Sequence, residues 1–398
     1  MRKFDYIICG AGAAGLSLAY YLVQAGLTDK RILLLDRSPK QGNDRTWCFW
    51  GLSAGPFEAL VRHRWEQVGI YSERCALRLS LHPYRYYMLR AADFYSFMDH
   101  WLAQHPNIVR CYEEVTSLAT QDDWAWVHTT AGSYGAEWVF NSIPFAGPVV
   151  EPSHHYLLQH FLGWFIRAPQ PCFDPQVATL MDFRVAQAPN GVRFVYVLPL
   201  DPCTALVEYT VFSASLLPRE AYEQALRAYL SRQLALSTFE VEHEEFGVIP
   251  MTDALFPRSD GRVVSIGIAG GDAKPSTGYT FWRAQRRAQR IAHALRCGES
   301  PSPLRTCRAT RHSFYDSVLL NVLQLGRRGG ERVFCELFAR SPVVRLLRFL
   351  DEDSSLLEEL QVMSSVHLPS FLAAALDVFR RRLRLWIAQQ RCEERRGR

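Results

Sequence analysis

The sequence lacks paired cysteines. It contains ten cysteines, but no two of them form a C-x-x-C motif. Short-spaced pairs are typical of disulfide scaffolds and of zinc sites, so the chain has the pattern of neither. Its histidines form no ligand set and no nucleophile partnership, and we interpret His154, His155 and His160 as incidental to chemistry. We expect a reduced protein without a bound metal.

Long apolar runs are also missing. The longest candidate, YLLQHFLGWFI at 156–166, is shorter than the ~18–20 residues needed to span a bilayer, and it contains Gln159 and His160. The first ten residues run directly into an apolar strand pattern, so we expect no secretory signal before the folded part. These features predict a cytoplasmic protein that is not integral to the membrane.

Low-complexity tracts, internal repeats and extended basic stripes are absent as well. The chain has 398 residues, 48% of them hydrophobic and 21% charged, which is the composition of one large or two interlocked globular domains. Its net charge is +5, and residues 371–398 alone hold eight arginines against three acidic residues. Since the rest of the chain is balanced and carries no nucleic-acid motif, we expect no nucleic-acid partner.

The basic C-terminal end is amphipathic. Apolar residues recur there at helical spacing, with arginines elsewhere around the helix: Leu372, Leu376, Phe379, Leu383 and Trp386. Such a helix either lies on an anionic membrane surface or packs on the domain with its basic face in water. The sequence leaves both interpretations open.

The N-terminal end has the pattern of a dinucleotide site. FDYIICGAGAAGLSLAYYLVQAG contains a short apolar strand, then Gly10-x-Gly12-x-x-Gly15, then a helical pattern. RILLLDRS follows as a second buried strand that ends in Asp36. In this pattern Gly10 makes the tight turn, Gly12 admits the pyrophosphate and Gly15 lets helix and strand pack closely. The helix N-terminus holds the phosphates and the carboxylate accepts from a ribose hydroxyl.

A second segment decides between FAD and NAD. GRVVSIGIAGGDAKPSTGYTFWRAQRRAQRIA (261–292) reads as a strand, a Gly-Gly-Asp loop and a helix. It resembles the second flavin motif of glutathione-reductase-type and hydroxylase-type flavoproteins, in which an Asp binds the ribityl chain and the helix N-terminus points at the flavin ring. By this resemblance Asp272 takes the ribityl contact. The helix dipole near Gly278 would favour negative charge on a reduced flavin.

Together the two motifs predict an α/β protein, with a Rossmann-type FAD-binding flavoprotein fold, an inserted mixed β-sheet substrate domain and a helical C-terminus. We expect the first part of the FAD domain at 1–80, mixed FAD-domain segments and the inserted substrate-binding sheet at 81–255, the second FAD part at 256–300, and the helical region at 301–398. The residues expected to bind FAD are Gly10, Gly12, Ala13, Ala14, Gly15, Asp36, Arg37, Arg45, Gly271, Asp272, Thr277, Gly278 and Tyr279.

TALVEYTVFS (204–213) places one carboxylate in a stretch that otherwise looks buried. Side chains alternate along a strand, so Leu206, Glu208 and Phe212 share one face. A carboxylate removed from water must be paired, hydrogen-bonded or shifted in pKa until it is a neutral acid. The residues alone leave two alternatives for Glu208: a structural residue that meets an arginine or reaches solvent near the end of the hairpin, and a functional acid.

Two classes of flavoprotein share the predicted frame: redox enzymes that hydroxylate or reduce, and enzymes that use reduced flavin without net redox change. Hydroxylases of the p-hydroxybenzoate type carry an Asp-Gly motif at the end of a mid-chain strand. Here the strand GAEWVFNSIPFAG (135–147) has Asn141 and Ser142 instead. This difference argues against a hydroxylase.

A more specific resemblance covers about residues 4–375. Several segments occur in the order and spacing of bacterial lycopene β-cyclases: NDRTWCFW (43–50), VFNSI (139–143), LLQHFLGWFIRAPQPCFDPQVATLMDFRV (157–185), FVYVLPL followed by ALVEYTVFS (194–213), EEFGVIPM (244–251) and KPSTGYTF (274–281). The resemblance implies acid-initiated, non-redox cyclisation of the ends of lycopene, or of a similar linear carotenoid, to β-ionone rings. It also implies reduced FAD, NAD(P)H as reductant and a peripheral place on the inner face of the cell membrane, as monomer or homodimer.

The family's essential carboxylate lies in a strand of the form apolar-apolar-Glu-x-Thr, and LVEYT places it at Glu208. Cyclisation needs a strong acid to protonate a double bond, and an apolar-buried Glu keeps its proton at neutral pH. By this resemblance Glu208 is the catalytic acid.

Other candidates keep a structural interpretation. We expect Glu245 to share a solvated strand face with Glu240, Glu242 and Glu244, and Asp182 to be structural. Trp47, like Arg45, lies where it could line the flavin or a substrate tunnel. Two alternative functions stay open: a flavin-dependent oxidoreductase, either a hydroxylase or a prenyl reductase, acting on a lipid or terpenoid, and a non-enzymatic carotenoid or quinone binder.

Overall fold

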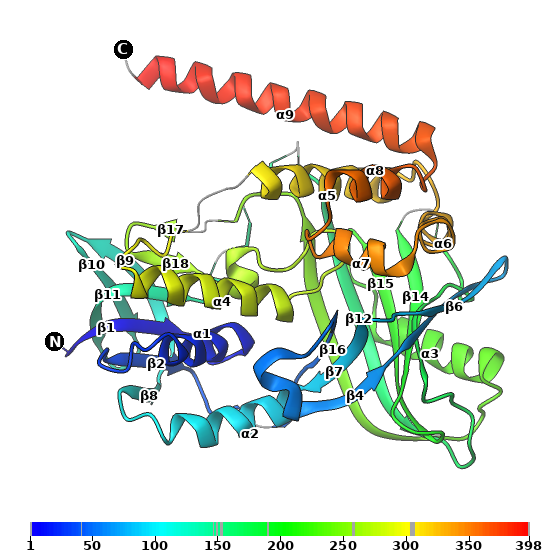
Figure 1. Ribbon diagram of the computed structural model, residues 1–398, viewed down its shortest axis with the longest axis horizontal. Helices are drawn as coiled ribbons and strands as arrows, with labels where there is room; N and C mark the ends of the chain where they lie inside the picture. The colour runs from blue at the N-terminus through cyan, green and yellow to red at the C-terminus, as the bar shows by residue number, and fades with distance from the viewer. Residues whose placement is uncertain are drawn as a thin grey trace.

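The computed structural model describes residues 2–40, 42–145, 147–148, 150–151, 154–188, 191–256, 259–302 and 307–396, and side chains other than those of 307–309, 386 and 388–396. In Figure 1 an N-terminal layered α/β unit lies beside a large curved sheet, and C-terminal helices lie across the top of both. The sheets contain eight, seven and three strands.

The eight-stranded sheet is the dinucleotide-type core. Its parallel strands lie in the order β18-β11-β1-β2-β8, and an antiparallel β9–β10 hairpin extends β11. The apolar strands β1 and β2 are buried on both faces, as parallel strands between layers must be. The helices α1 and α4 pack against each other on one face. The elements are β1 (Arg2–Cys9), α1 (Ala13–Gln24), β2 (Ile32–Asp36), β8 (Ile108–Tyr112), β9 (Val115–Gln121), β10 (Trp124–Thr129), β11 (Ser133–Asn141), β17 (Ser259–Asp260), β18 (Val263–Ser265), η2 (Gly267–Gly270) and α4 (Phe281–Arg296).

The seven-stranded sheet is mixed and has the order β16-β12-β15-β14-β13-β5-β6, in which only β13 and β5 pair in parallel. The central strand β15 is buried along nearly its whole length, whereas the edge strand β16 alternates between exposed and buried positions. Its elements are β5 (Gln67–Ser72), β6 (Cys75–Ser80), β12 (Tyr156–Arg167), β13 (Val177–Asp182), β14 (Val192–Pro199), β15 (Thr204–Ser213) and β16 (Glu240–Thr252).

The two faces of this sheet have separate cores. One face packs on α3 (Arg219–Gln233), through residues such as Val207, Tyr209 and Leu226. The other face packs on the C-terminal helices, through residues such as Leu206, Phe212 and Phe334. These helices are α5 (Cys307–Gln324), α6 (Gly330–Arg340), α7 (Val343–Leu350), α8 (Leu356–Met363) and α9 (Leu368–Arg396).

A three-stranded sheet connects the two larger units. Its order is β3-β7-β4, and the aromatic residues of β3 pack on the start of α4, where Trp47 and Phe49 stack on Phe281. The remaining elements are β3 (Thr46–Gly51), η1 (Gly55–Leu60), β4 (Val61–Trp65), β7 (Arg85–Arg90) and α2 (Ala91–Leu102). The predicted fold class is confirmed: a Rossmann-type core, a mixed sheet and a helical C-terminus.

Candidate active site

The glycine-rich turn after β1 has the geometry that a dinucleotide cradle requires. Gly10 has φ +95°, and a Cβ atom on Gly15 would lie 1.9 Å from the carbonyl oxygen of Gly10. At Gly12 a Cβ atom would meet nothing within 4 Å. The turn is therefore tight where helix and strand pack and open where a pyrophosphate would approach.

Asp36 is buried at the end of β2 and accepts a hydrogen bond from the backbone N of Ala11 at 2.7 Å. Lys40, which the sequence analysis did not single out, lies with its Nζ 3.1 Å from Oδ2 of Asp36. Arg37 and Arg45 are exposed, and Arg45 donates to backbone carbonyls of Asp44 and Phe246. The structure thus brings Asp36 to the glycine turn and leaves both arginines at the surface.

The second motif lies directly against the first. A Cβ atom on Gly267 would lie 2.9 Å from Cβ of Ala14, which follows Ala13 in the first turn of α1. Asp272 is buried and accepts from the backbone N of Gly267 at 2.7 Å. Its other oxygen accepts from the guanidinium of Arg287 at 2.8 Å, a partner that the sequence pattern did not reveal because it lies on the following helix.

The loop between Asp272 and α4 supplies the remaining predicted cofactor residues. Gly271 and Gly278 have φ of +74° and +73°, and Gly278 lies so close to Gln159 on β12 that a Cβ atom there would overlap its Oε1. Gln159 Oε1 and Ser276 Oγ are buried and find no hydrogen-bond partner among the residues that the structure describes. Unpaired buried polar atoms are costly, so this loop fits a polar ligand that would satisfy them.

An apolar cavity of about 280 Å³ opens beside this loop. It lies between the seven-stranded sheet and the C-terminal helices, and aromatic and aliphatic side chains line most of it. Thr277 and Tyr279 of this loop and Leu368 and Leu372 of α9 are among its lining residues. A cavity of this kind binds an apolar ligand through contact area and offers few groups that could orient it by hydrogen bonds.

Glu208 lies on the cavity side of β15. Its backbone pairs with Tyr196, and Tyr196 and Phe212 both line the cavity. The side chain is 9% exposed, and its Oε1 accepts a hydrogen bond from the hydroxyl of Thr210 at 2.7 Å. Burial, with a further contribution from the charge of Glu245, raises the pKa of Glu208 to about 8. None of the ion pairs among the described residues includes it, so Glu208 is a protonated acid at neutral pH.

The expectation for Glu245 is wrong. Glu240 and Glu242 are exposed and Glu244 is half-buried, but Glu245 is only 6% exposed. Side chains alternate along a strand, so Glu245 lies on the opposite face of β16 from Glu244. It lies beside Gly163 of β12, and Thr46 of β3 donates to its Oε2 at 2.8 Å. The expectation grouped Glu245 with its acidic neighbours although the alternation separates it from them, and the sequence does not show that β3 covers this face.

Asp182 is buried but fully paired. Its oxygens accept from the guanidinium of Arg184, at 2.9 and 2.6 Å, and from the hydroxyl of Tyr229 on α3 at 2.7 Å. These contacts link β13 to the helix behind the sheet. They agree with the structural interpretation of this residue.

Two of the three histidines are buried in polar contacts away from the cavity lining. His155 bonds Asp253 at 2.8 Å and Asn321 at 2.8 Å, and His160 bonds the hydroxyl of Tyr222 at 2.6 Å. Burial lowers the pKa of His160 to about 4, so it is neutral. Within the described residues, no group of three or more His, Cys, Asp or Glu side chains could hold a metal ion.

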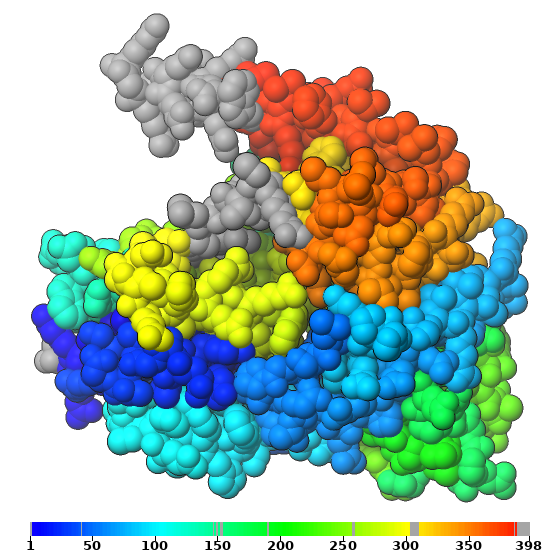
Figure 2. All heavy atoms as spheres, viewed as in Figure 1, coloured from blue at the N-terminus to red at the C-terminus, as the bar shows by residue number. Residues whose placement is uncertain are grey.

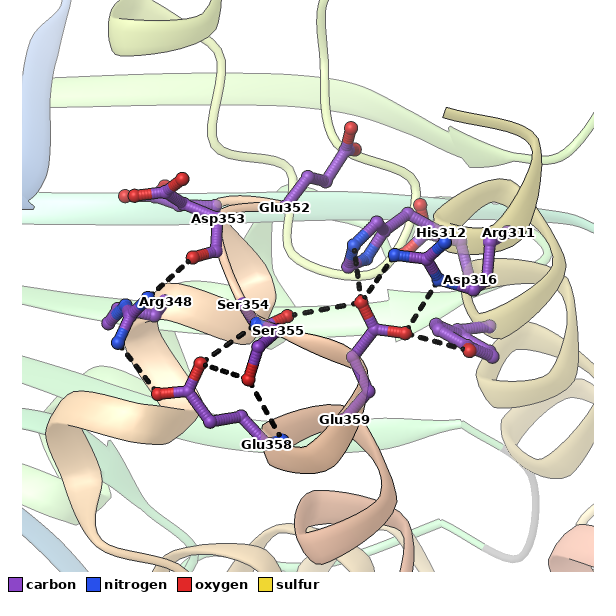
Figure 3. Close-up of polar contacts among 12 residues, drawn as sticks. Arg311, His312, Asp316, Arg348, Glu352, Asp353, Ser354, Ser355, Glu358 and Glu359 are labelled. Carbon is purple, nitrogen blue, oxygen red and sulfur yellow. Dashed lines mark hydrogen bonds and ion pairs between the residues drawn. The ribbon is translucent and has the colours of Figure 1, made fainter. Parts of the chain in front are cut away.

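Helix α8 lines the cavity with Val362 and Met363, and polar contacts hold it to α5. Figure 3 shows Glu359 of α8 pointing toward α5, where it accepts from two nitrogens of Arg311 at 2.7 and 2.8 Å. The hydroxyl of Tyr315 adds a bond at 3.0 Å, and Ser355 with Glu358 forms a capping box at the start of the helix. This network fixes which face of α8 points outward.

The outward faces of α8 and α9 form what we call the apolar platform. In Figure 2 these orange and red helices form the upper surface of the molecule. Helix α9 packs on α5 through residues such as Phe371, Ala374 and Val378, whereas other large apolar residues of α9 are exposed. The platform consists of exposed Leu356, Leu357, Leu360, Leu368, Leu372, Leu376, Phe379, Leu383 and Ile387. The side chain of Trp386 lies outside the described residues.

No single helix in the described part of the chain has the length and hydropathy to cross a membrane, although α8 and the first part of α9, bent by 119°, pass that test as a pair. Leu368 and Leu372 belong both to the platform and to the cavity lining. The cavity therefore reaches the platform.

Comparison with solved structures supports the fold. A geranylgeranyl bacteriochlorophyll reductase-like protein from Thermoplasma acidophilum superposes with a TM-score of 0.62 at 14% identity, covering 95% of this chain and all of the other. The flavin-dependent brominase Bmp2 superposes with a TM-score of 0.58 at 12% identity, over 96% and 100% of the two chains. At these identities the likeness shows a shared flavoprotein fold.

Sequence comparison is more specific. A lycopene β-cyclase from Synechococcus elongatus is 26% identical over 75% of this chain and 74% of its own length. A lycopene β-cyclase from Pantoea ananas is 28% identical over 73% and 74% of the two chains. The family model described as lycopene cyclase protein matches residues 5–376, and the chain therefore belongs to the lycopene cyclase family.

Proposed function

We propose that this enzyme cyclises the ends of lycopene, or of a similar linear carotenoid, to β-ionone rings. The observation that carries the proposal is Glu208. It is a buried carboxylic acid on the cavity side of β15 with no ion-pair partner among the described residues, and it lies next to residues that line an apolar cavity in a flavoprotein fold. A hydrocarbon offers a protein nothing but apolar surface and double bonds. An acid of raised pKa in an apolar cavity fits such a substrate.

The chain's own groups supply the first and decisive step. The carboxyl of Glu208 gives its proton to C2 of the terminal C1=C2 bond, which forms a C–H bond and leaves a tertiary cation at C1. The electrons of the C5=C6 bond then form the C1–C6 bond, and loss of the proton from C6 restores a C5=C6 double bond. One proton enters and one leaves, so the net reaction is an isomerisation. The apolar lining excludes water, which would otherwise capture the cation.

Reduced FAD, when bound, supplies negative charge beside the developing cation. The two glycine turns, Asp36, Asp272 and the unpaired polar atoms of Gln159 and Ser276 are the groups that would hold it. NAD(P)H is the proposed reductant that primes the flavin. Because the reaction has no net redox change, we expect reductant to be needed for activation but not consumed in proportion to product.

The apolar platform supports peripheral binding to the inner face of the cell membrane from the cytoplasm. Soluble monomers rarely expose contiguous apolar patches of this kind unless a partner or membrane covers them. The exposed arginines Arg380 and Arg384 lie on α9 beside it, so anionic lipid headgroups complement its charge. A substrate dissolved in lipid would reach the cavity where Leu368 and Leu372 meet the platform.

Expression in a lycopene-accumulating bacterial host, followed by chromatography of the pigments, tests the reaction. We expect lycopene to be replaced by carotenoids with one or two β-rings. With purified protein, reduced FAD should support conversion and oxidised FAD should not. Consumption of NADPH in proportion to product would instead favour an oxidoreductase, and lipid binding without ring formation would favour a carrier.

Flotation with liposomes tests the membrane proposal. The double variant Leu357→Glu/Leu360→Glu should bind vesicles containing phosphatidylglycerol much more weakly than the wild type, whereas Leu52→Glu, at an exposed leucine outside the platform, should bind equally well. Both sites are exposed, so neither change should unfold the protein. Equal binding of all three proteins would remove the platform as the docking surface.

A further inference from the structure

Glu208 does not lie alone on its face of the sheet. Gly163 on β12 pairs with Glu208 on one side and with Glu245 on β16 on the other. A Cβ atom on Gly163 would lie 3.5 Å from Cβ of Glu208 and 3.2 Å from Cγ of Glu245. The missing side chain of Gly163 leaves the space over which the two acidic side chains approach each other.

Both carboxyl groups are buried and both are bonded only to hydroxyls. Thr210 donates to Glu208 at 2.7 Å and Thr46 donates to Glu245 at 2.8 Å. Neither residue forms an ion pair within the described part of the chain. Two neighbouring carboxyls without a compensating cation resist ionising together, so the pair holds on to a proton.

The other polar groups around Glu208 carry no charge. It faces the thiol of Cys48 on β3 and the phenols of Tyr196 on β14 and Tyr279 in the loop before α4. Burial raises the pKa of each of these groups, so all three are neutral at neutral pH. Of the groups that face Glu208 from the elements packed against it, Glu245 is therefore the one able to carry a charge.

The surroundings of Glu245 favour the ionised form of its carboxyl more than the surroundings of Glu208 do. Burial is the largest influence and leaves the pKa of Glu245 above its ordinary value, although the Thr46 hydroxyl, His243 and Arg45 act to lower it. For Glu208, the Thr210 hydroxyl is the one described group that lowers the pKa. Of the two carboxyls, Glu245 thus has more groups around it that stabilise the carboxylate.

We propose that Glu245 is the positioning residue for the catalytic proton: its carboxylate, held beside Glu208 across Gly163, keeps the initiating proton on Glu208 at neutral pH. This rests on the proposed function in that it takes Glu208 as the acid. When the environments of two carboxyls separate their pKa values in this way, one carboxyl serves as the acid and the other is its ionised partner. Glu245 thus acts through Glu208 and need not touch the substrate.

Infrared spectroscopy of the purified protein tests this independently of turnover. The carbonyl band of the protonated Glu208 carboxyl is assigned as the band lost in Glu208→Gln, and its intensity is followed against pH. In Glu245→Gln we expect the midpoint of this band to fall by about 1–3 pH units, the effect of removing a close like charge. Glu245→Asp, which keeps the charge, should restore most of the wild-type midpoint.

The activity profile gives the second measurement. The rate should fall as pH rises through the titration of Glu208, and this fall should move to lower pH by the same amount in Glu245→Gln. Glu244→Gln is the matched control, since Glu244 is its neighbour on β16 but bonds Trp164 and Arg219 instead. If Glu245→Gln does not fold, Thr46→Val removes the hydroxyl that favours the Glu245 carboxylate and should shift the band in the same direction.

An unchanged midpoint of the Glu208 band in Glu245→Gln, or in Thr46→Val if the former is unfolded, would overturn the proposal. If the midpoint of the Glu208 band shifts in Glu245→Gln but the wild type forms no β-rings, the coupling of Glu208 and Glu245 is upheld and the proposed function is refuted. The two failures are therefore distinguishable.

Discussion

The two faces of the seven-stranded sheet each bury acidic side chains, but they surround them differently. Toward α3, Asp182 is held by Arg184 and by the hydroxyl of Tyr229. Toward the cavity, Glu208 and Glu245 each accept from one hydroxyl, and neither forms an ion pair with any residue that the structure describes. Among the described residues, the same sheet thus contains one acidic residue with an ion-pair partner, Asp182, and two neighbouring acidic residues without one, Glu208 and Glu245.

This contrast shows which property separates a structural acid from a functional one. Both kinds of residue are removed from water, so burial does not distinguish them. A guanidinium stabilises the ionised form and makes the acid part of the scaffold. Where two neighbouring carboxyls have only hydroxyl donors, they resist ionising together, so one proton stays on the pair and is available to a substrate. The comparison predicts that the two faces respond to neutralising mutations in different assays.

The largest expected effect is on catalysis by Glu208. Glu208→Gln keeps the size and the hydrogen-bonding ability of the side chain but removes the acid. Cyclisation should fall by about 10²–10⁴-fold, the range typical of general acid–base catalysis. Pigment conversion per mole of folded protein is the measurement. Normal conversion by a folded Gln variant would exclude Glu208 from the mechanism.

Two controls accompany this variant. Glu208→Asp retains an acid but withdraws it from the double bond by about one methylene, so it should keep part of the activity. The flavin content and the unfolding midpoint of Glu208→Gln should not fall below those of the wild type. Loss of activity only through failure to fold would return Glu208 to a structural role.

The next effect concerns stability and the opposite face. Asp182→Asn leaves Arg184 without its carboxylate and weakens the link to Tyr229 on α3. Breaking a buried ion pair costs about 3–5 kcal/mol, and we expect the lower end because the Arg184 side chain is 32% exposed. Urea denaturation should show this loss, while the activity of the remaining folded protein stays close to wild type. If Asp182→Asn lost turnover without losing stability, Asp182 would not be a structural acid and the two faces would not differ in this way.

The last effect is a pH dependence of stability, which over any single pH unit is smaller than the effect of Asp182→Asn. The pKa of Glu208 is about 8 in the folded protein and ordinarily 4.5, so the unfolded chain ionises first as pH rises. Between these two values wild-type stability should fall relative to Glu208→Gln by up to about 1.4 kcal/mol per pH unit, and the difference should be constant below and above that window. Unfolding midpoints of both proteins from pH 4 to 9 check this. Parallel curves would mean that Glu208 is ionised when folded.

The dinucleotide core was predictable because its signals are local. Gly10, Gly12, Gly15 and Asp36 follow one another within one strand–turn–helix–strand unit, and each residue type meets a requirement of backbone geometry. The second motif was found for the same reason. Its partner Arg287 was not, because an arginine on a helix carries no sign of the carboxylate it will meet.

The C-terminal helix shows the limit of a periodic pattern. The spacing of Leu372, Leu376 and Phe379 predicted an apolar face. Only the structure shows that this face points outward, while Ala374 and Val378 pack on α5. Periodicity reveals that a face exists, but the neighbouring elements decide what covers it.

The sequence by itself determined the class of fold, the family and the place of Glu208 in a strand, because these depend on residues close together in the chain or on motifs in a fixed order. The tertiary structure decided that Glu208 has no cationic partner within the described part of the chain, that Glu245 lies beside it and that Asp182 is paired with Arg184. These facts depend on strand register across β15, β12 and β16 and on which helix covers which face. Register and coverage arise from the packing of distant segments, and it is this packing that sets the dielectric environment and the charge around each carboxyl.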